Sequence, residues 1–149
     1  MTTVRDLLDD KGRTIWSIDQ GASVYDAVAL MADKNIGALT VTSNESKLAG
    51  ILSERDYTRK IILHSRASKE TLVSEIMTPN VTFATEDTPI QKCMTLMTQQ
   101  KIRHLPIVEG YVPVGMLTLG DIMKTVIDEQ AVAIEELESF VFEEQGGEG

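Results

Sequence analysis

The hydrophobic pattern of this chain occurs twice. Apolar residues at the helical spacing i, i+3, i+4 and i+7 predict two helices with one buried face each. The first set is Val24, Ala27, Val28 and Met31. The second set follows 66 residues later and is Ile90, Cys93, Met94 and Met97. Ser23 and Thr88 are the expected N-caps, and Pro89 would stand at the first helical position.

The repeat continues on both sides of these helices. Residues 36–41 match 102–107, and residues 50–56 match 115–121 after the loss of one residue. Residues 4–8 match 73–77 upstream, and short strands are predicted at 14–18 and 81–85. Each copy is therefore expected to form a helical lead-in, a short strand, a helix, a strand, a turn, a strand and a helix.

This pattern predicts an α+β fold built from two copies of one unit. Each copy would be a small β-sheet packed with two helices, and the copies would face each other about a pseudo-twofold axis, because half the chain has too little core by itself. The expected boundaries are 4–66 for the first repeat with its lead-in and 73–127 for the second. Residues 128–149 would form a helical C-terminal extension.

The charge of the chain is concentrated in that extension. The 149 residues carry a formal charge of −9, and the segment 128–149 contains no Lys or Arg. An acidic tail repels phosphate backbones, so nucleic acid is a poor partner. Apolar runs are too short for a membrane span. The single cysteine and the acids near the N-terminus favour a reducing compartment and a cytoplasmic location.

Several motifs give the repeat a family resemblance. The marks are the segments 50–56 and 115–121, the strand 104–108 (His-Leu-Pro-Ile-Val) and the lead-in 75–79 (Glu-Ile-Met-Thr-Pro). Residues 4–127 resemble a tandem pair of CBS domains, also called a Bateman module. The resemblance implies an adenosine-containing ligand in the cleft between the copies: AMP, ADP or ATP, with S-adenosylmethionine or an NAD-type dinucleotide also possible. It also implies a homodimer and an unidentified regulated protein.

Two acids are the first candidate ligand-binding residues. Asp56 and Asp121 end the repeated segments, and a single carboxylate can accept hydrogen bonds from both hydroxyls of a ribose. Ser53 and Thr118 stand three residues earlier, where their hydroxyls could bond the ribose or a phosphate. The alternative for all four residues is helix capping.

Phosphate needs cations, and the two copies differ in this respect. Arg103 and His104 begin a strand of the second copy at positions where the resemblance implies phosphate contacts. The first copy has Gly37 and Ala38 there, so the two sites are expected to differ in affinity. Arg55 could also reach the cleft. The alternative for these bases is an exposed surface position.

Apolar residues complete the candidate ligand-binding set. By family position, the adenine walls would be Ile15, Ile36, Val81 and Ile102, with core packing as the alternative. Gly50 and Gly115 would allow either a tight turn or close approach.

The residues needed for catalysis are missing from the pattern. The chain has two histidines, no metal-ligand spacing and no phosphate-binding glycine loop, and Cys93 is expected to be a core thiol. The leading hypothesis is a non-catalytic nucleotide sensor that signals to a partner. The alternative is a structural interaction module with a degenerate pocket.

The C-terminal extension suggests how the chain assembles. A helix is predicted from about residue 121 to 142, with an apolar stripe formed by Ile127, Ala131, Ile134, Leu137 and Val141. A helix with acids on its other faces needs cover for such a stripe. The expectation is a homodimer through the CBS helices, with the extension packed across the partner or lying over the body.

Overall fold

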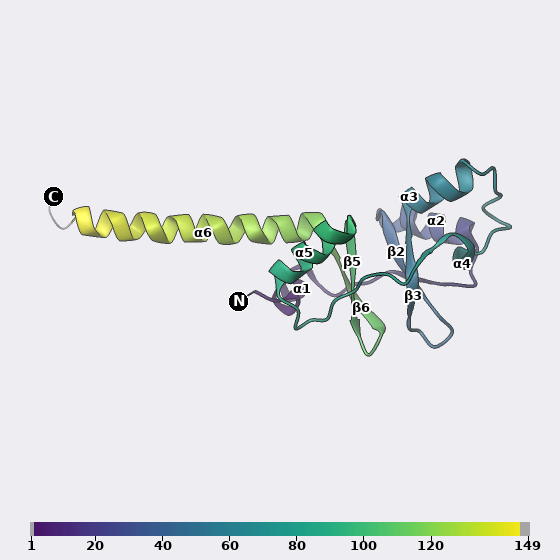
Figure 1. Ribbon diagram of the computed structural model, residues 1–149, viewed down its shortest axis with the longest axis horizontal. Coiled ribbons are helices and arrows are strands. Elements are labelled where there is room, and N and C mark those ends of the chain that lie inside the picture. The colour runs from purple at the N-terminus through teal and green to yellow at the C-terminus, as the bar shows by residue number, and fades with distance from the viewer. Residues whose placement is uncertain (1, 147–149) are drawn as a thin grey trace.

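The computed structural model describes residues 2–146, with side chains through residue 141 (Figure 1). The helices are α1 (Val4–Lys11), α2 (Val24–Lys34), α3 (Glu54–Tyr57), α4 (Val73–Ile76), α5 (Ile90–Gln100) and α6 (Leu119–Gly146), and a π-helical turn, η1 (Thr58–Ile62), continues α3. The strands are β1 (Ser17–Asp19), β2 (Ala38–Thr42), β3 (Leu48–Ser53), β4 (Thr78–Pro79), β5 (His104–Glu109) and β6 (Val112–Thr118). The fold is therefore α+β with two units and a C-terminal helix, as predicted.

The two units contain sheets of unequal size. The first is four-stranded in the order β1-β2-β3-β4, with β1 parallel to β2 and the other pairs antiparallel. The second is the antiparallel pair β5-β6. The strand predicted at 81–85 is reduced to one parallel bridge between Ala84 and Ile107, and the strand predicted from residue 14 begins at Ser17.

The helices α2 and α5 begin and end by local rules. Ser23 caps α2, because its side-chain oxygen accepts a hydrogen bond from Asp26 N at 3.1 Å. The prediction that Thr88 caps α5 is wrong by one residue: the N-cap is Pro89, and Thr88 Oγ1 accepts from Thr85 N at 3.1 Å. Both helices end in a left-handed residue with φ of 54°, Asn35 and Lys101.

The two hydrophobic cores exchange their lead-in helices. Val4, Leu7 and Leu8 of α1 pack into the core of the second repeat, although α1 precedes the first. In the same way, α4 packs Val73 and Ile76 into the core of the first repeat. The predicted boundaries 4–66 and 73–127 group each lead-in helix with the repeat that follows it in the sequence. In the structure, each lead-in helix packs into the core of the other repeat.

Two glycines permit this exchange. A Cβ on Gly50 would lie 2.6 Å from Thr78 O, and a Cβ on Gly115 would lie 3.0 Å from Leu8 Cδ1. In both repeats the exchanged segment therefore lies directly against the strand. A side chain at position 50 would collide with the backbone of Thr78, and one at position 115 would force the Leu8 side chain to shift. The sequence offered two roles for these glycines, a tight turn or close approach of a ligand. The structure shows close approach, but of other segments of the same chain: Thr78 at Gly50 and Leu8 at Gly115.

The helix α6 leaves the body of the molecule (Figure 1). It has 28 residues, and Ile122 near its start is fully buried in the second core. Ile127 is 59% exposed, and the apolar residues from there to Val141 are exposed as well. The expectation that the extension lies over its own body is therefore wrong. Among the described residues, no helix is both long and apolar enough to cross a membrane.

Candidate functional site

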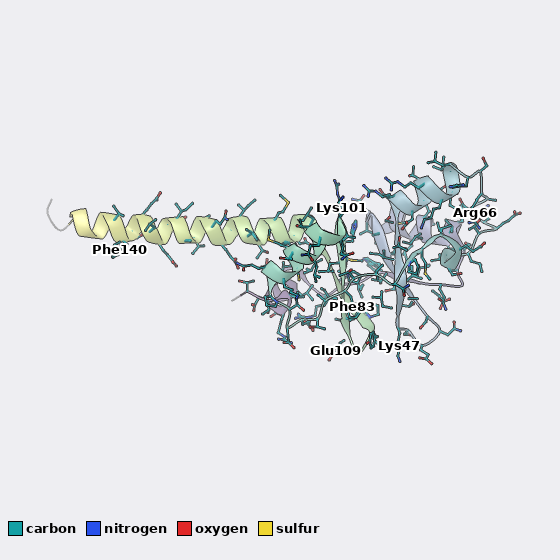
Figure 2. All side chains as sticks on the ribbon, viewed as in Figure 1. Lys47, Arg66, Phe83, Lys101, Glu109 and Phe140 are labelled. Carbon is teal, nitrogen blue, oxygen red and sulfur yellow. The ribbon has the colours of Figure 1, made fainter. Side chains whose placement is uncertain are left out.

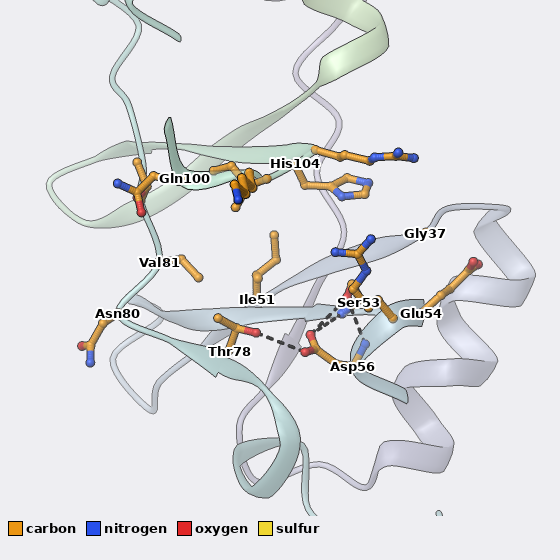
Figure 3. Close-up of a pocket in the computed structure, with 15 residues that line it drawn as sticks. Gly37, Ile51, Ser53, Glu54, Asp56, Thr78, Asn80, Val81, Gln100 and His104 are labelled. Carbon is orange, nitrogen blue, oxygen red and sulfur yellow. Dashed lines mark hydrogen bonds between the residues drawn. The ribbon is translucent and has the colours of Figure 1, made fainter. Parts of the chain in front are cut away.

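A cavity of about 540 Å³ lies between the two repeats (Figure 3). Its wall comes from three parts of the chain: residues 37 and 51–56 of the first repeat, residues 78–82 after α4, and residues 100–104 of the second repeat. Small-molecule sites in proteins have volumes of roughly 300–1,000 Å³. The cavity is therefore large enough for a nucleotide, and both repeats would contact it.

The cavity gathers seven of the eleven candidate ligand-binding residues. These are Ser53, Arg55, Asp56, Val81, Ile102, Arg103 and His104. The remaining four are not part of its wall: Ile15, Ile36, Thr118 and Asp121. Ile36 packs against the first hydrophobic core, which is the alternative considered for it. The first and second repeats thus contribute unequally to one site.

The carboxylate of Asp56 is held by the turn from β3 into α3. Ser53 N and Ser53 Oγ donate to Asp56 Oδ2 at 3.0 and 3.1 Å, and Asp56 N donates back to Ser53 Oγ at 3.2 Å. This is a complete capping box. The capping role is therefore real for both residues, and Asp56 keeps only 8% of its surface exposed.

The second oxygen of Asp56 faces the exchanged segment. Thr78 Oγ1 donates to Asp56 Oδ1 at 3.1 Å (Figure 3). Lys60 Nζ lies 3.4 Å from the same oxygen. Lys60 Nζ also donates to Ile76 O at 2.9 Å. A carboxylate oxygen has two acceptor positions, and the hydroxyl of threonine can rotate. Oδ1 is therefore the atom of Asp56 that a ligand hydroxyl can reach.

Both repeats contribute positive charge to the cavity wall. Lys101 and Arg103 follow α5, and Arg55 comes from α3, next to Asp56. Glu54 also lines the cavity. The cavity therefore has an acid anchored in the first repeat and cations from both repeats, with Ile51, Val81 and Ile102 among its apolar surfaces. Such a distribution suits a ligand with an apolar ring, hydroxyls and an anionic group.

His104 lies where the two repeats meet. Its Nε2 is 4.0 Å from the position that a Cβ on Gly37 would take. Burial lowers the pKa of His104 below its ordinary value, and the charge of Lys11 lowers it further, while Glu54 opposes this shift. Its surroundings therefore favour the neutral ring, and a phosphate beside it would favour the protonated form.

Asp121 has the same cap but a different third partner. Thr118 N donates to Asp121 Oδ2 at 2.9 Å, and Asp121 N donates to Thr118 Oγ1 at 3.1 Å. Lys11 Nζ, at the end of α1, lies 2.5 Å from the same Oδ2 and 2.7 Å from Met116 O. Burial acts to raise the pKa of Asp121, but the bonds from Lys11 and Thr118 outweigh it, so the pKa is lowered.

Some wall residues have no counterpart among the predicted site residues. Thr78 and Asn80 lie in the segment after α4, and Gln100 and Lys101 end α5. In the sequence, the motif 75–79 carries only part of the family resemblance. In the structure, its threonine, Thr78, contacts Asp56. Lys101 is the left-handed residue that ends α5, two residues before Arg103. Its place in the cavity wall could be predicted only from the position at which the helix ends.

Two further features concern other chemistry. Cys93 is fully buried, and burial raises the pKa of its thiol to about 11, so it stays protonated near neutral pH. Within the residues that the structure describes, no group of three His, Cys, Asp or Glu side chains is placed to hold a metal ion.

Comparison with known proteins decides the family. The model of the CBS domain matches residues 4–63 and 73–128. The chain belongs to the CBS-domain family. The mitochondrial CBS domain-containing protein CBSX3 of Arabidopsis thaliana is 37% identical over 98% of this chain and 73% of its own length. Longer plant CBS-domain proteins are matched over about a fifth of their length.

Solved CBS-domain structures show the same fold. A putative signal-transduction protein with CBS domains from Burkholderia ambifaria has a TM-score of 0.79 and 45% identity, covering 87% of this chain and 96% of the other. The CBS domain pair of protein MJ0100 has a TM-score of 0.76 and 26% identity over 87% of this chain and 98% of its own. That pair was solved in complex with 5'-methylthioadenosine and S-adenosyl-L-methionine.

Proposed function

We propose that this CBS-domain protein is a non-catalytic regulatory module that binds an adenosine phosphate of the AMP, ADP or ATP class between its repeats. The observation that carries the proposal is the cavity itself, in which the Asp56 carboxylate, apolar walls and three cations face one space. The adenosine-containing ligands of the MJ0100 domain pair support the choice of ligand class.

The adenosine part would use the acid and the apolar walls. Ile51, Val81 and Ile102 supply surfaces for the adenine ring. The ribose hydroxyls would donate to Asp56 Oδ1, where the Thr78 hydroxyl already donates at 3.1 Å. Because the capping box holds Oδ2, the carboxylate is oriented before the ligand arrives, and little ordering entropy is lost on binding.

The phosphate part would use the cations. Arg103 is the main candidate, with Arg55 and Lys101 as further donors from neighbouring parts of the wall. A guanidinium can bond two phosphate oxygens at once, and such charge-assisted bonds are about twice as strong as neutral ones. His104 would add a bond if the phosphate raises its lowered pKa.

Signalling would follow from the position of the ligand. Both repeats line the cavity, so the ligand binds best to one arrangement of the two units. Differential affinity of this kind shifts the population toward that arrangement, and a partner can respond to the shift. The proposed assembly is a homodimer, and the regulated protein is a further, unidentified partner. A cytoplasmic location stays a prediction, because the relative CBSX3 has "mitochondrial" in its name.

Calorimetry and thermal melts with AMP, ADP, ATP, NAD and S-adenosylmethionine test the proposal. A ligand at a hundredfold excess over its Kd adds about 2.7 kcal/mol to the free energy of unfolding. For a chain of this size the Tm should rise by about 5–10 °C. If no adenosine compound at millimolar concentration raises the Tm or releases heat, the chain is instead an interaction module with a degenerate pocket.

A further inference from the structure

The two sides of the nucleotide cavity differ in their side chains. Asn80 and Val81, which are uncharged, line one side (Figure 3). Glu54 and His104 line the other side, and Asp56 lies between the two sides (Figure 3). A ligand with its adenine ring on the uncharged side and its ribose at Asp56 therefore directs its phosphates toward Glu54 and His104.

Glu54 and His104 meet at one point of the wall. Gly37 has no side chain there, and the position that a Cβ would take lies 3.9 Å from Glu54 Cδ and 4.0 Å from His104 Nε2. The carboxylate and the ring therefore face the same small space. The charge of Glu54 also acts on the ring, because it opposes the lowering of the pKa of His104 that burial causes. A phosphate beside His104 would therefore experience the negative charge of Glu54.

The structure gives Glu54 no other specific partner. It takes part in none of the ion pairs between the described residues, whereas Asp56 and Asp121 each have a lysine. As the first residue of α3, Glu54 lies at the positive end of the helix dipole. That role is shared with Asp56, which also lies in the first turn. Stability of α3 therefore does not explain why an acid stands in the cavity wall at position 54.

We propose that Glu54 is a specificity-determining residue that limits the number of phosphates on the bound nucleotide. This inference rests on the proposed function, in which an adenosine phosphate binds in this cavity. The cations of the wall attract every phosphate, so by themselves they favour ATP over AMP. Glu54 opposes that preference, because each phosphate beyond the first adds negative charge on the side of the cavity where Glu54 stands. Glu54 thus shifts the selectivity of the site toward the monophosphate.

Removal of this one charge tests the inference. Glu54→Gln keeps the size of the side chain, and calorimetry gives the Kd values of adenosine, AMP and ATP. EDTA is present at low ionic strength, so that no divalent cation covers the phosphates. ATP should bind about three- to tenfold more tightly to the variant than to the parent, and AMP should change by less than about twofold. Adenosine should not change, and high salt should reduce the gain for ATP.

A matched control separates this effect from the net charge of the chain. Glu109 is an exposed acid at the end of β5 and is not part of the cavity wall (Figure 2). Glu109→Gln makes the same change in net charge and should leave all three Kd values as in the parent.

The ratio of the ATP Kd to the AMP Kd decides the outcome. The inference is overturned if Glu54→Gln keeps the ratio of the parent, or if Glu109→Gln changes the ratio as much as Glu54→Gln does. It is also overturned if, with Mg²⁺ added, the parent binds ATP more tightly than Glu54→Gln does, because the carboxylate would then act through the cation. An unchanged ratio in a variant that still binds AMP rejects only the role of Glu54. A parent that binds none of the three compounds rejects the proposed function as well.

Discussion

The two acids at the ends of the repeated segments have the same cap and different surroundings. Asp56 and Asp121 each accept from the backbone three residues earlier, at 3.0 and 2.9 Å. Oδ1 of Asp56 accepts from the hydroxyl of Thr78 and lies 3.4 Å from Lys60 Nζ, and Asp56 lines an open cavity. The third partner of Asp121 is the ammonium of Lys11 at 2.5 Å.

The exchanged lead-in segments cause this difference. α4 ends at Ile76, and the chain then passes Asp56 with Thr78. α1 has eight residues, and its last residue, Lys11, reaches Asp121. Local repetition thus determines the cap of each acid, while the lead-in from the other unit determines which further groups meet it, and of the two acids only Asp56 lines the cavity. We therefore expect nucleotide binding at the Asp56 site first.

The largest expected effect is on binding of AMP when each acid is removed in turn. Asp56→Ala should weaken binding by about 10- to 150-fold, since hydrogen bonds to a charged group contribute about 1.5–3 kcal/mol. Asp121→Ala should change the Kd by less than about threefold, because Asp121 is not part of the cavity wall and its carboxylate is paired with Lys11. Calorimetry measures both Kd values. Equal losses in the two variants would contradict the asymmetry.

The next effect concerns the phosphate. Arg103→Ala should weaken AMP and ATP by about tenfold and leave adenosine nearly unchanged, because only the phosphates use a charge-assisted bond. Lys47→Ala removes a cation at the β2–β3 turn, away from the cavity wall, and serves as the matched control (Figure 2). A loss of adenosine affinity equal to that of AMP would show that Arg103 acts on the fold and not on the phosphate.

A third change should make the two sites more alike. Lys11→Met removes the ammonium from Asp121 and keeps the length of the side chain. A second, weaker binding event should then appear in calorimetry at millimolar AMP, raising the stoichiometry from one to two. The same change at the exposed Lys47 should leave the stoichiometry at one. An unchanged stoichiometry in the folded Lys11 variant would show that another group closes the Asp121 site.

The smallest expected effect is a dependence of stability on pH. The pKa of His104 is lower in the fold than in the unfolded chain, mainly by burial. Stability is therefore complete above the unfolded value of about 6.5 and declines as pH falls below it, since the unfolded chain takes up the proton first. The charged groups that act on the ring are Lys11, Glu54, Arg103 and Asp121.

Substitution of the histidine tests this dependence. His104→Gln should flatten the change in Tm between pH 7 and pH 5, by less than about 1 kcal/mol of stability. His64, which is exposed in the linker, is the matched control, and His64→Gln should retain the slope of the parent. Identical slopes in the parent and the His104 variant would exclude the ring as the source.

The parts of the fold that could be predicted from the sequence depend on short-range rules. The buried faces of α2 and α5 follow from helical spacing, and Ser53 and Asp56 follow from a capping motif three residues long. The partner of Asp121 could not be predicted in this way, because Lys11 stands 110 residues earlier. The prediction of two sites that differ in affinity through their cations lacked the exchange of α1 and α4, which no local pattern specifies.

The contrast between short-range rules and long-range contacts also explains which candidate site residues line the cavity. Val81, Ile102 and Arg103 were correctly brought to one cavity by their place in the repeat. Of their counterparts in the other copy, Ile15 and Ile36 do not line it and Gly37 does. A repeat predicts equivalent positions and does not predict which copy opens a space. The role of Thr78 could not be anticipated in this way, because it depends on contact with Asp56 of α3, which lies 22 residues earlier in the chain.

The exchange of lead-in helices also bears on how the chain acquires its structure. During synthesis α1 emerges first, yet its contacts, such as that of Lys11 with Met116, lie 105 residues further along. The first unit likewise lacks α4 until the linker is complete. Neither half of the chain contains all the helices of its own core, so the two halves should fold together in a single late step, after most of the chain has left the ribosome. A gene split between the repeats would separate each core from one of its own helices.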